Sequence, residues 1–320
     1  MSQSNSARIL TEWNTHHDAL YHLRPQELEW NLHSQDLVSY EFKNLGGTLG
    51  LIAQATPIGI SQGLPEKSLS LSLWGEVRSP ALLVQSFVEL ARERGKVRLL
   101  FGADEFHFLA GIPAQDAALI EAAVSNGFQT SPVSDFTGNL ETLAVTTYLA
   151  QGSKIAAENH LSLDLIKNND DHKNLLSYLQ NEFPGRWVRE YQIWKNRRDT
   201  SKSWWMIFRQ NKNDIVGFAR LSQRGHDKPE NSWTPGALKF SLSENHGWKD
   251  SDGSLGPIGV SRSHQGKGYG KALLALVLQA LRQKSVDRIC IDWTNAFKYY
   301  EPLGFAQSRN YLSSWRNVDK

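Results

Sequence analysis

The chain has 320 residues, of which 40% are hydrophobic and 10% aromatic, so it exceeds one domain of ordinary size and has enough apolar surface for folded cores. The single cysteine, Cys290, excludes an internal disulfide and leaves no thiol cluster for a metal, so we expect a buried thiol and no metal site. The formal net charge of +2 hides an uneven distribution, because residues 1–150 hold 9 Lys and Arg against 16 Asp and Glu, whereas residues 151–320 hold 26 against 17.

The N-terminal residues are polar, and the longest apolar stretch, residues 272–281, is too short to cross a bilayer. We therefore expect a soluble cytoplasmic protein without a membrane partner. The basic second half suits a polyanionic cofactor, although a nucleic-acid-binding module is a weaker alternative. Its basic residues are scattered, with one cluster at Lys195, Arg197 and Arg198, so no nucleic-acid partner is expected.

The first half predicts strands and helices in a regular order. Residues 42–53 are typical of a hairpin, and residues 67–74 alternate strictly as a strand does. Residues 80–94 predict an amphipathic helix with Pro80 in its first turn, and residues 97–101 predict the next strand. A later helix ends at residues 126–128, Asn-Gly-Phe.

Small and polar residues at 150–160 mark the expected domain junction, which divides the chain into residues 1–150 and 151–320. Residues 161–166 then alternate as a strand, and residues 169–171 are expected to cap a helix that runs to about Glu182. Residues 204–208 and 215–221 predict a strand hairpin, and residues 238–242 a further strand.

The most informative motif is a glycine-rich loop, Gln265-Gly-Lys-Gly-Tyr-Gly270, between the apolar run 256–260 and a helical stretch at 271–281. Glycines allow consecutive backbone N–H groups to approach one anion closely, and the following helix adds its positive end. A strand at 287–292 and a short helix ending at Leu303-Gly-Phe305 follow. The pattern indicates a pyrophosphate seat.

In order and spacing, these roughly 50 residues resemble the acetyl-CoA motif of the GNAT acetyltransferase superfamily, with Arg262 where that family often has proline. The outline of the first half is similar but carries Gly75-Glu-Val-Arg-Ser-Pro80 in place of the loop, and the Glu76 charge would repel phosphate. The layout resembles tandem GNAT proteins. It implies an α/β (α+β) fold of two GNAT-like domains, each a mixed, mostly antiparallel sheet flanked by helices, with a degenerate first copy; an unrelated first domain is the alternative.

The resemblance implies acetyl-CoA as the cofactor. Its pyrophosphate would lie on the loop, with Asn295 on the pantetheine arm and strand backbone at the thioester. The expected cofactor-binding residues are Ile258, Gly259, Val260, Gln265, Gly266, Lys267, Gly268, Tyr269, Gly270, Lys271 and Asn295. A helix cap is the simpler interpretation of Asn295, and solvated surface that of the two lysines.

On the family pattern, Tyr300 protonates the departing thiolate, while Tyr299 is interpreted as packing. Candidates for the base that takes the amine proton are Asp292, Glu244 and His246, and a water chain without a dedicated base is a further alternative. Asp292 is favoured because Ile-Asp-Trp-Thr resembles the tandem group and an acetyltransferase module attached to some amino-sugar hydrolases.

Arg186 and Trp187 fall on the loop expected to border the acceptor, where a guanidinium fork and a flat ring would contact substrate. The resulting hypothesis is direct acetyl transfer to a primary amine of a small molecule, an amino sugar ahead of an amino acid or polyamine. A non-catalytic acyl-CoA sensor and a peptide or protein N-acetyltransferase are the alternatives. The sequence leaves open whether the protein is a monomer or a homodimer.

Overall fold

The computed structural model describes residues 3–23, 25, 28–29, 32, 38–61, 64–102, 109–143, 147–196, 203–212, 214–223 and 251–318. The helices are α1 (Gln3–His16), η1 (Ala19–Tyr21), α3 (Pro57–Ser61), α4 (Pro80–Glu93), α5 (Ala117–Ser125), α6 (Leu140–Leu143), α7 (Thr147–Glu158), α8 (Asn169–Glu182), α9 (Arg186–Asn196), η4 (Arg262–His264), α11 (Tyr269–Gln283), α12 (Phe297–Tyr300) and η5 (Glu301–Leu303). The strands are β1 (Val38–Leu45), β2 (Thr48–Ala55), β3 (Ser68–Trp74), β4 (Arg98–Phe101), β5 (Ile112–Pro113), β6 (Gln129–Asn139), β7 (Leu161–Leu165), β8 (Ser203–Gln210), β9 (Asp214–Gln223), β10 (Gly253–Val260), β11 (Arg288–Thr294) and β12 (Ala306–Asn317).

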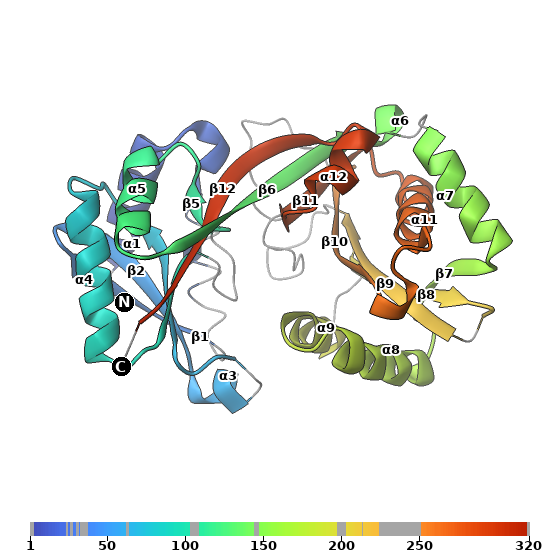
Figure 1. Cartoon of the computed structure of the whole chain (residues 1–320), viewed down its shortest axis with the longest axis horizontal. Helices are drawn as coiled ribbons and strands as arrows, with labels where there is room; N and C mark the ends of the chain where they lie inside the picture. The colour runs from blue at the N-terminus through green and yellow to red at the C-terminus, as the bar shows by residue number, and fades with distance from the viewer. Residues whose placement is uncertain are drawn as a thin grey trace.

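The described strands form one mixed sheet in the order β1-β2-β3-β4-β12-β6-β11-β10-β9-β8-β7, with β5 paired to β12. Most neighbours are antiparallel, and the parallel pairs are β3 with β4 and β10 with β11. Two lobes flank the long strands β6 and β12, which run from one lobe to the other (Figure 1). The expected class, a mostly antiparallel α/β sheet flanked by helices in a tandem arrangement, is confirmed.

The two lobes exchange strands at their junction. The end of β6 pairs with β11 in the second lobe, whereas the end of β12 pairs with β4 in the first, from Ser314↔Phe101 to Asn317↔Arg98. The cores follow the same exchange, because Tyr311 and Val318 join the first core and Phe136 joins the second. Both chain ends therefore lie in the first lobe (Figure 1).

Helices cover both faces of the sheet in the second lobe. Successive residues of a strand point to opposite faces, so Phe208 of β8 packs beneath α7 and α11, while Ile207 packs beneath α8 and α9. Apolar residues at helical spacing bury one face of α11, as the sequence predicted: Ala272, Leu273, Leu274, Val277, Leu278 and Leu281. This sandwich fixes the positions of β10 and β11, between which the candidate site lies.

Several expectations need correction. The stretch 150–160, expected as the domain junction, lies largely in α7, which packs so closely on α11 that a Cβ at Gly152 would lie 2.5 Å from the Lys271 carbonyl oxygen. The cap of α8 is Asn168, one residue earlier than predicted, and its side chain accepts hydrogen bonds from the N–H groups of Asp170 and Asp171. The strand expected at 238–242 lies outside the described residues.

Candidate active site

The parallel strands β10 and β11 part to open the site. They pair at Gly253↔Ile289 and Ser254↔Cys290 and then separate, while β10 stays paired with β9 as far as Val260. Beyond Ser254, β10 therefore offers backbone N–H and C=O groups on the side from which β11 has withdrawn. Such a strand edge can hydrogen-bond an extended ligand.

Each of the parting strands carries a β-bulge. On β10, Gly256 and Pro257 oppose the single residue Arg220 of β9, because Leu255 pairs with Leu221 and Ile258 with Ala219. On β11, Asp292 and Trp293 oppose the single residue Asp135 of β6, because Ile291 pairs with Phe136 and Thr294 with Ser134. A bulge bends its strand and redirects side chains, which accounts for the divergence at this point.

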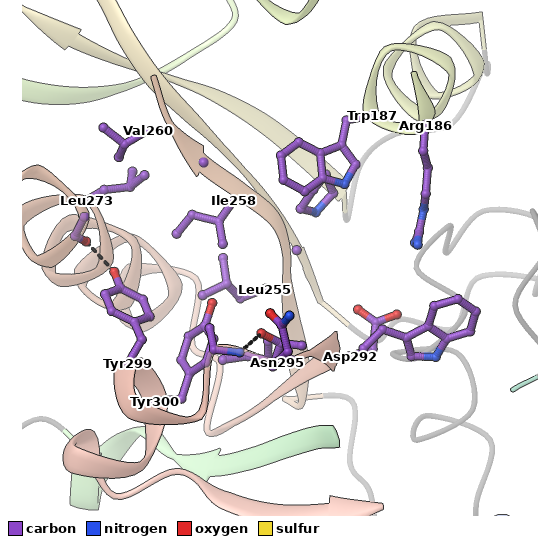
Figure 2. Close-up of a pocket in the computed structure, with 18 of the residues that line it drawn as sticks. Arg186, Trp187, Leu255, Ile258, Val260, Leu273, Asp292, Asn295, Tyr299 and Tyr300 are labelled. Carbon is purple, nitrogen blue, oxygen red and sulfur yellow. Dashed lines mark hydrogen bonds between the residues drawn. The ribbon is translucent and has the colours of Figure 1, made fainter. Parts of the chain in front are cut away.

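A cavity of about 760 Å³ fills the opening. Its lining includes Arg186, Trp187, Glu190, Leu255, Gly256, Pro257, Ile258, Gly259, Val260, Gln265, Gly266, Gly270, Leu273, Ile291, Asp292, Trp293, Thr294, Asn295, Ala296, Tyr299 and Tyr300. Figure 2 shows Val260, Leu273 and Tyr299 toward one end, Arg186, Trp187 and Asp292 toward the other, and Tyr300 between them.

Three residues of the glycine loop, Gln265, Gly266 and Gly270, line this cavity. Gly266 and Gly268 have φ of 78° and 80°, a left-handed conformation that favours glycine. Gly268 is the N-cap of α11 and makes no side-chain cap, so the first-turn N–H groups of that helix are available to an anion. A Cβ at Gly266 would meet nothing within 4 Å, which leaves room for phosphate oxygens beside the backbone. These features fit the pyrophosphate seat that the motif indicates.

Four predicted cofactor residues do not line this cavity. Gly268 faces α7, where a Cβ would lie 2.8 Å from Ile155, and Lys267 is exposed. Tyr269 is buried and accepts a 2.8 Å hydrogen bond at its hydroxyl from Gln210 Nε2. Lys271 donates to Gln151 at 2.9 Å, so its ammonium is directed to α7.

Tyr300 lies at the middle of the cavity. The residue is only 4% exposed, and its ring packs near Phe136 and Phe305 with centroids 5.8 and 5.7 Å away. Burial, together with Tyr148 and Asp292, raises the pKa of the Tyr300 phenol, which therefore stays protonated at neutral pH. The neighbouring Tyr299 donates its hydroxyl proton to the Gly270 carbonyl at 2.5 Å, which ties α12 to the first turn of α11.

Charged side chains surround the opposite end. Arg186 forms an ion pair with Glu190 on the next turn of α9, and the Arg186 guanidinium lies 5.3 Å from the centroid of the Trp293 ring. Arg220 is 1% exposed and donates to Ser203 at 3.2 Å. Burial lowers the pKa of Arg220 to about 10, although Glu190 and Asp292 oppose that shift. This end thus brings Arg186 and Arg220 together with Glu190 and Asp292.

Trp187 and Trp293 add flat apolar surface to the same end, from α9 and β11. Trp187 packs against Phe183 and Phe218, with ring centroids 5.2 and 5.5 Å away, which holds the indole in place.

Glu244, a candidate base, lies outside the described residues, as does His246. Cys290 is 1% exposed, which confirms the expectation of a buried thiol.

The corresponding strand, loop and helix of the first half, β3 to α4, have a different environment. A carboxylate oxygen of Glu12 on α1 accepts a 3.1 Å hydrogen bond from the Glu76 N–H, and a Cβ at Gly75 would lie only 1.9 Å from that oxygen. Burial would raise the pKa of Glu12, but hydrogen bonds from Arg8 and the Glu76 N–H outweigh it and lower the pKa. Trp13, fully buried, packs edge-on against Trp74 at 5.3 Å. The Glu12 carboxylate of helix α1 thus occupies the space beside the backbone of this loop.

Parting parallel strands beside a glycine loop at a helix N-terminus are the arrangement of the GNAT fold. Residues 172–305 match the model of the acetyltransferase (GNAT) family, and the match lies within the half of the chain that carries this cavity. No helix among the described residues is long and apolar enough to span a membrane.

Solved structures extend the likeness in fold to the first half. A glucosamine N-acetyltransferase region of a fungal multi-domain GH3 beta-N-acetylglucosaminidase matches with a TM-score of 0.72 and 18% identity over 98% of this chain and 37% of that one, so this chain spans little more than a third of it. A GCN5-related N-acetyltransferase from Sphaerobacter thermophilus has a TM-score of 0.59 and 13% identity, over 98% and 92% of the two chains. A tandem GNAT protein from the clavulanic acid biosynthesis pathway has a TM-score of 0.56 and 16% identity, over 100% of this chain and 96% of that one. No curated protein matches in sequence.

Several site residues were not predicted. Glu190 follows Arg186 by four residues, a spacing that signals an ion pair on a helix. Arg220 lies within an apolar strand, where a lone charge signals a buried partner. The sequence predicts no separate role for Trp293, which belongs to the Ile-Asp-Trp-Thr motif. Asp135 offered no local signal, because its contacts come from distant segments.

Proposed function

We propose that this protein is an acetyl-CoA-dependent N-acetyltransferase that transfers an acetyl group directly to a primary amine of a small molecule, in its second half. The observation that carries the proposal is the cavity between β10 and β11, because Gly266 of the glycine loop, the Tyr300 phenol and the Asp292 carboxylate all line it. Figure 2 shows Tyr300 between Val260 and Asp292. The match of residues 172–305 to the GNAT family supports the reaction class.

The cofactor end of the cavity suits a long polyanionic ligand. The first-turn N–H groups of α11 and the loop at Gly266 would hold the pyrophosphate, and the free edge of β10 from Ile258 to Val260 would hold the pantetheine arm. Asn295 lines the cavity opposite that edge, where its amide would bind the same arm. Bound acetyl-CoA supplies an acetyl group activated as a thioester, which a neutral amine attacks to form an amide with release of the thiol.

Two side chains handle the protons of that reaction. Tyr300 holds a proton on its phenol oxygen, because burial keeps the pKa raised, and is the donor for the departing sulfur. Asp292 lines the amine end and carries the negative charge that would attract an ammonium group and accept its proton. Forming the amide removes two protons from an ammonium substrate. Asp292 accepts the first before the attack and later releases it to solvent, and the second, lost from the nitrogen after the attack, restores the proton that Tyr300 gives to the sulfur.

The amine end favours a polyhydroxylated amine, such as an amino sugar. Two indole faces, Trp187 and Trp293, offer flat walls for a sugar ring, and the carboxylate of Asp292 offers a partner for its amine. The Arg186 guanidinium is already engaged by Glu190 and lies over Trp293, so it acts here as part of the wall. The fungal neighbour, a glucosamine N-acetyltransferase region, supports the same substrate class.

The test is release of the CoA thiol from acetyl-CoA in the presence of a panel of amines: glucosamine, lysine, spermidine and a peptide with a free N-terminus. We expect glucosamine to give the highest kcat/KM, with a product heavier by one acetyl group in mass spectrometry. Tight acetyl-CoA binding without amine-dependent thiol release would instead indicate a sensor. If the peptide gives the fastest release of the CoA thiol, the proposed substrate class is wrong, although the proposed acetyl-transfer reaction stands.

A further inference from the structure

The bulge on β11 has an unusual backbone. Trp293 has φ of 51°, in the left-handed region that residues with a bulky side chain rarely adopt. It is one of the two bulge residues that oppose Asp135, and both Asp292 and Trp293 line the cavity. Because such a conformation costs on the order of 1–3 kcal/mol, its surroundings must hold it in place.

Asp135 makes the contact that holds this backbone. One of its carboxylate oxygens, Oδ1, accepts a 2.9 Å hydrogen bond from the Trp293 N–H. The other, Oδ2, lies 2.7 Å from Nε of Arg309, the residue directly opposite on β12. Asp135 is fully buried and Arg309 is 4% exposed. The positive charge of Arg309 therefore compensates for the cost of burying the negative charge of Asp135.

Strand β12 is also irregular beside Asp135. Its pairing with β6 shifts between Gln307 and Arg309, and the extra residue, Ser308, donates its hydroxyl proton to the Asp135 carbonyl at 3.1 Å. Asp135 thus lies between two bulges, one on each neighbouring strand. Its side chain and backbone fix the strand geometry at the place where β6 and β12 cross between the lobes.

The Trp293 side chain connects this arrangement to the amine end. The ring packs against the core of the first lobe, and the guanidinium of Arg186 lies over it. The carboxylate of Asp292, the preceding residue, shares the same bulge. A change in the Trp293 backbone would therefore move an indole wall and a carboxylate together.

We propose that Asp135 is a positioning residue for the amine site, which sets the bulge at Asp292 and Trp293 through its hydrogen bond to the Trp293 N–H. The inference rests on the proposed function of the second half. Asp135 precedes residue 150 in the chain, so the amine site depends on a residue from the first half, on the strand that the two lobes share.

The test compares two double variants that both lack the ion pair. Asp135→Asn with Arg309→Met keeps an oxygen that can accept a hydrogen bond from the Trp293 N–H, whereas Asp135→Leu with Arg309→Met keeps the branched shape of the side chain but has no acceptor. We expect kcat/KM for the amine to be on the order of tenfold lower in the Leu variant than in the Asn variant, because a small misplacement of reacting groups is costly. The dissociation constant of acetyl-CoA should be equal in both, since the glycine loop is untouched.

Hydrogen–deuterium exchange of peptides that cover residues 288–296 adds a readout that does not depend on turnover. We expect faster exchange at Trp293 in the Leu variant than in the Asn variant. Equal exchange and equal amine kcat/KM in the two variants would overturn the positioning role. If the Leu variant does not fold, Asp135→Ala with Arg309→Met gives the same comparison. If the wild-type protein acetylates no amine, the proposed function fails, and the exchange data alone decide whether Asp135 holds the bulge.

Discussion

Tyr300→Phe removes one hydroxyl from the centre of the cavity and keeps the ring. The packing on Phe136 and Phe305 is retained, so we expect the melting temperature and the acetyl-CoA dissociation constant to stay close to wild type. A hydrogen bond to a charged group is worth about 1.5–3 kcal/mol, so loss of the donor to the departing thiolate should lower kcat roughly 10- to 150-fold. Steady-state thiol release measures kcat, and calorimetry measures the dissociation constant.

Tyr299→Phe is the matched control, one residue away on the same helix. Its hydroxyl binds the Gly270 carbonyl, so its loss should lower the free energy of unfolding by about 1 kcal/mol and reduce kcat far less than the Tyr300 variant. If Tyr300→Phe turns over at the wild-type rate, or if both variants lose kcat equally, Tyr300 is not the proton donor and its role is packing.

Further predictions concern the cofactor seat, the amine site and pH. Calorimetry should find one acetyl-CoA site per chain, because only the second half offers the glycine loop and the Glu12 carboxylate lies beside its counterpart; two sites would contradict this. Gly268→Glu should bind none, because its Cβ would lie 2.8 Å from Ile155 of α7 and would displace the loop. Trp187→Ala should raise the KM of the amine and spare that of acetyl-CoA, with Trp187→Phe in between; a change in the acetyl-CoA KM alone would move this residue to the cofactor site. Burial lowers the pKa of His172, whose Nδ1 lies 2.6 Å from the Tyr191 hydroxyl, so the fold favours the neutral ring. The free energy of unfolding should therefore decrease as pH falls below about 6.5, and His172→Gln should reduce that slope in acid denaturation; equal slopes would refute it.

Local patterns predicted the elements that local forces determine. The strict alternation in β3, the Pro-led helix α4 and the glycine loop before α11 all appear close to the expected residues, because periodicity and turn chemistry act over a few neighbours. The loop, Tyr300, Asn295, Asp292, Arg186 and Trp187 do come together at one cavity.

The strand exchange could not be predicted in the same way. Strand β6 is mostly polar, with three consecutive buried residues, and so lacks the alternation of a half-buried strand. Its partners on β11 and β12 are 149 to 186 residues away in the chain, and pairing over that distance leaves no local trace. The ion pair of Asp135 and Arg309 could not be predicted for the same reason, because the two residues are far apart in the sequence and meet only when β6 pairs with β12.

A crystal structure with bound CoA would test the assignment of the site most directly. We expect the pyrophosphate on the loop from Gly266 to Gly270, the pantetheine along β10, and the sulfur within about 3.5 Å of the Tyr300 hydroxyl oxygen, a hydrogen-bonding distance for sulfur. Density for CoA in the first lobe at residues 75–80, or a sulfur directed away from Tyr300, would contradict the assignment of the active site to the second half.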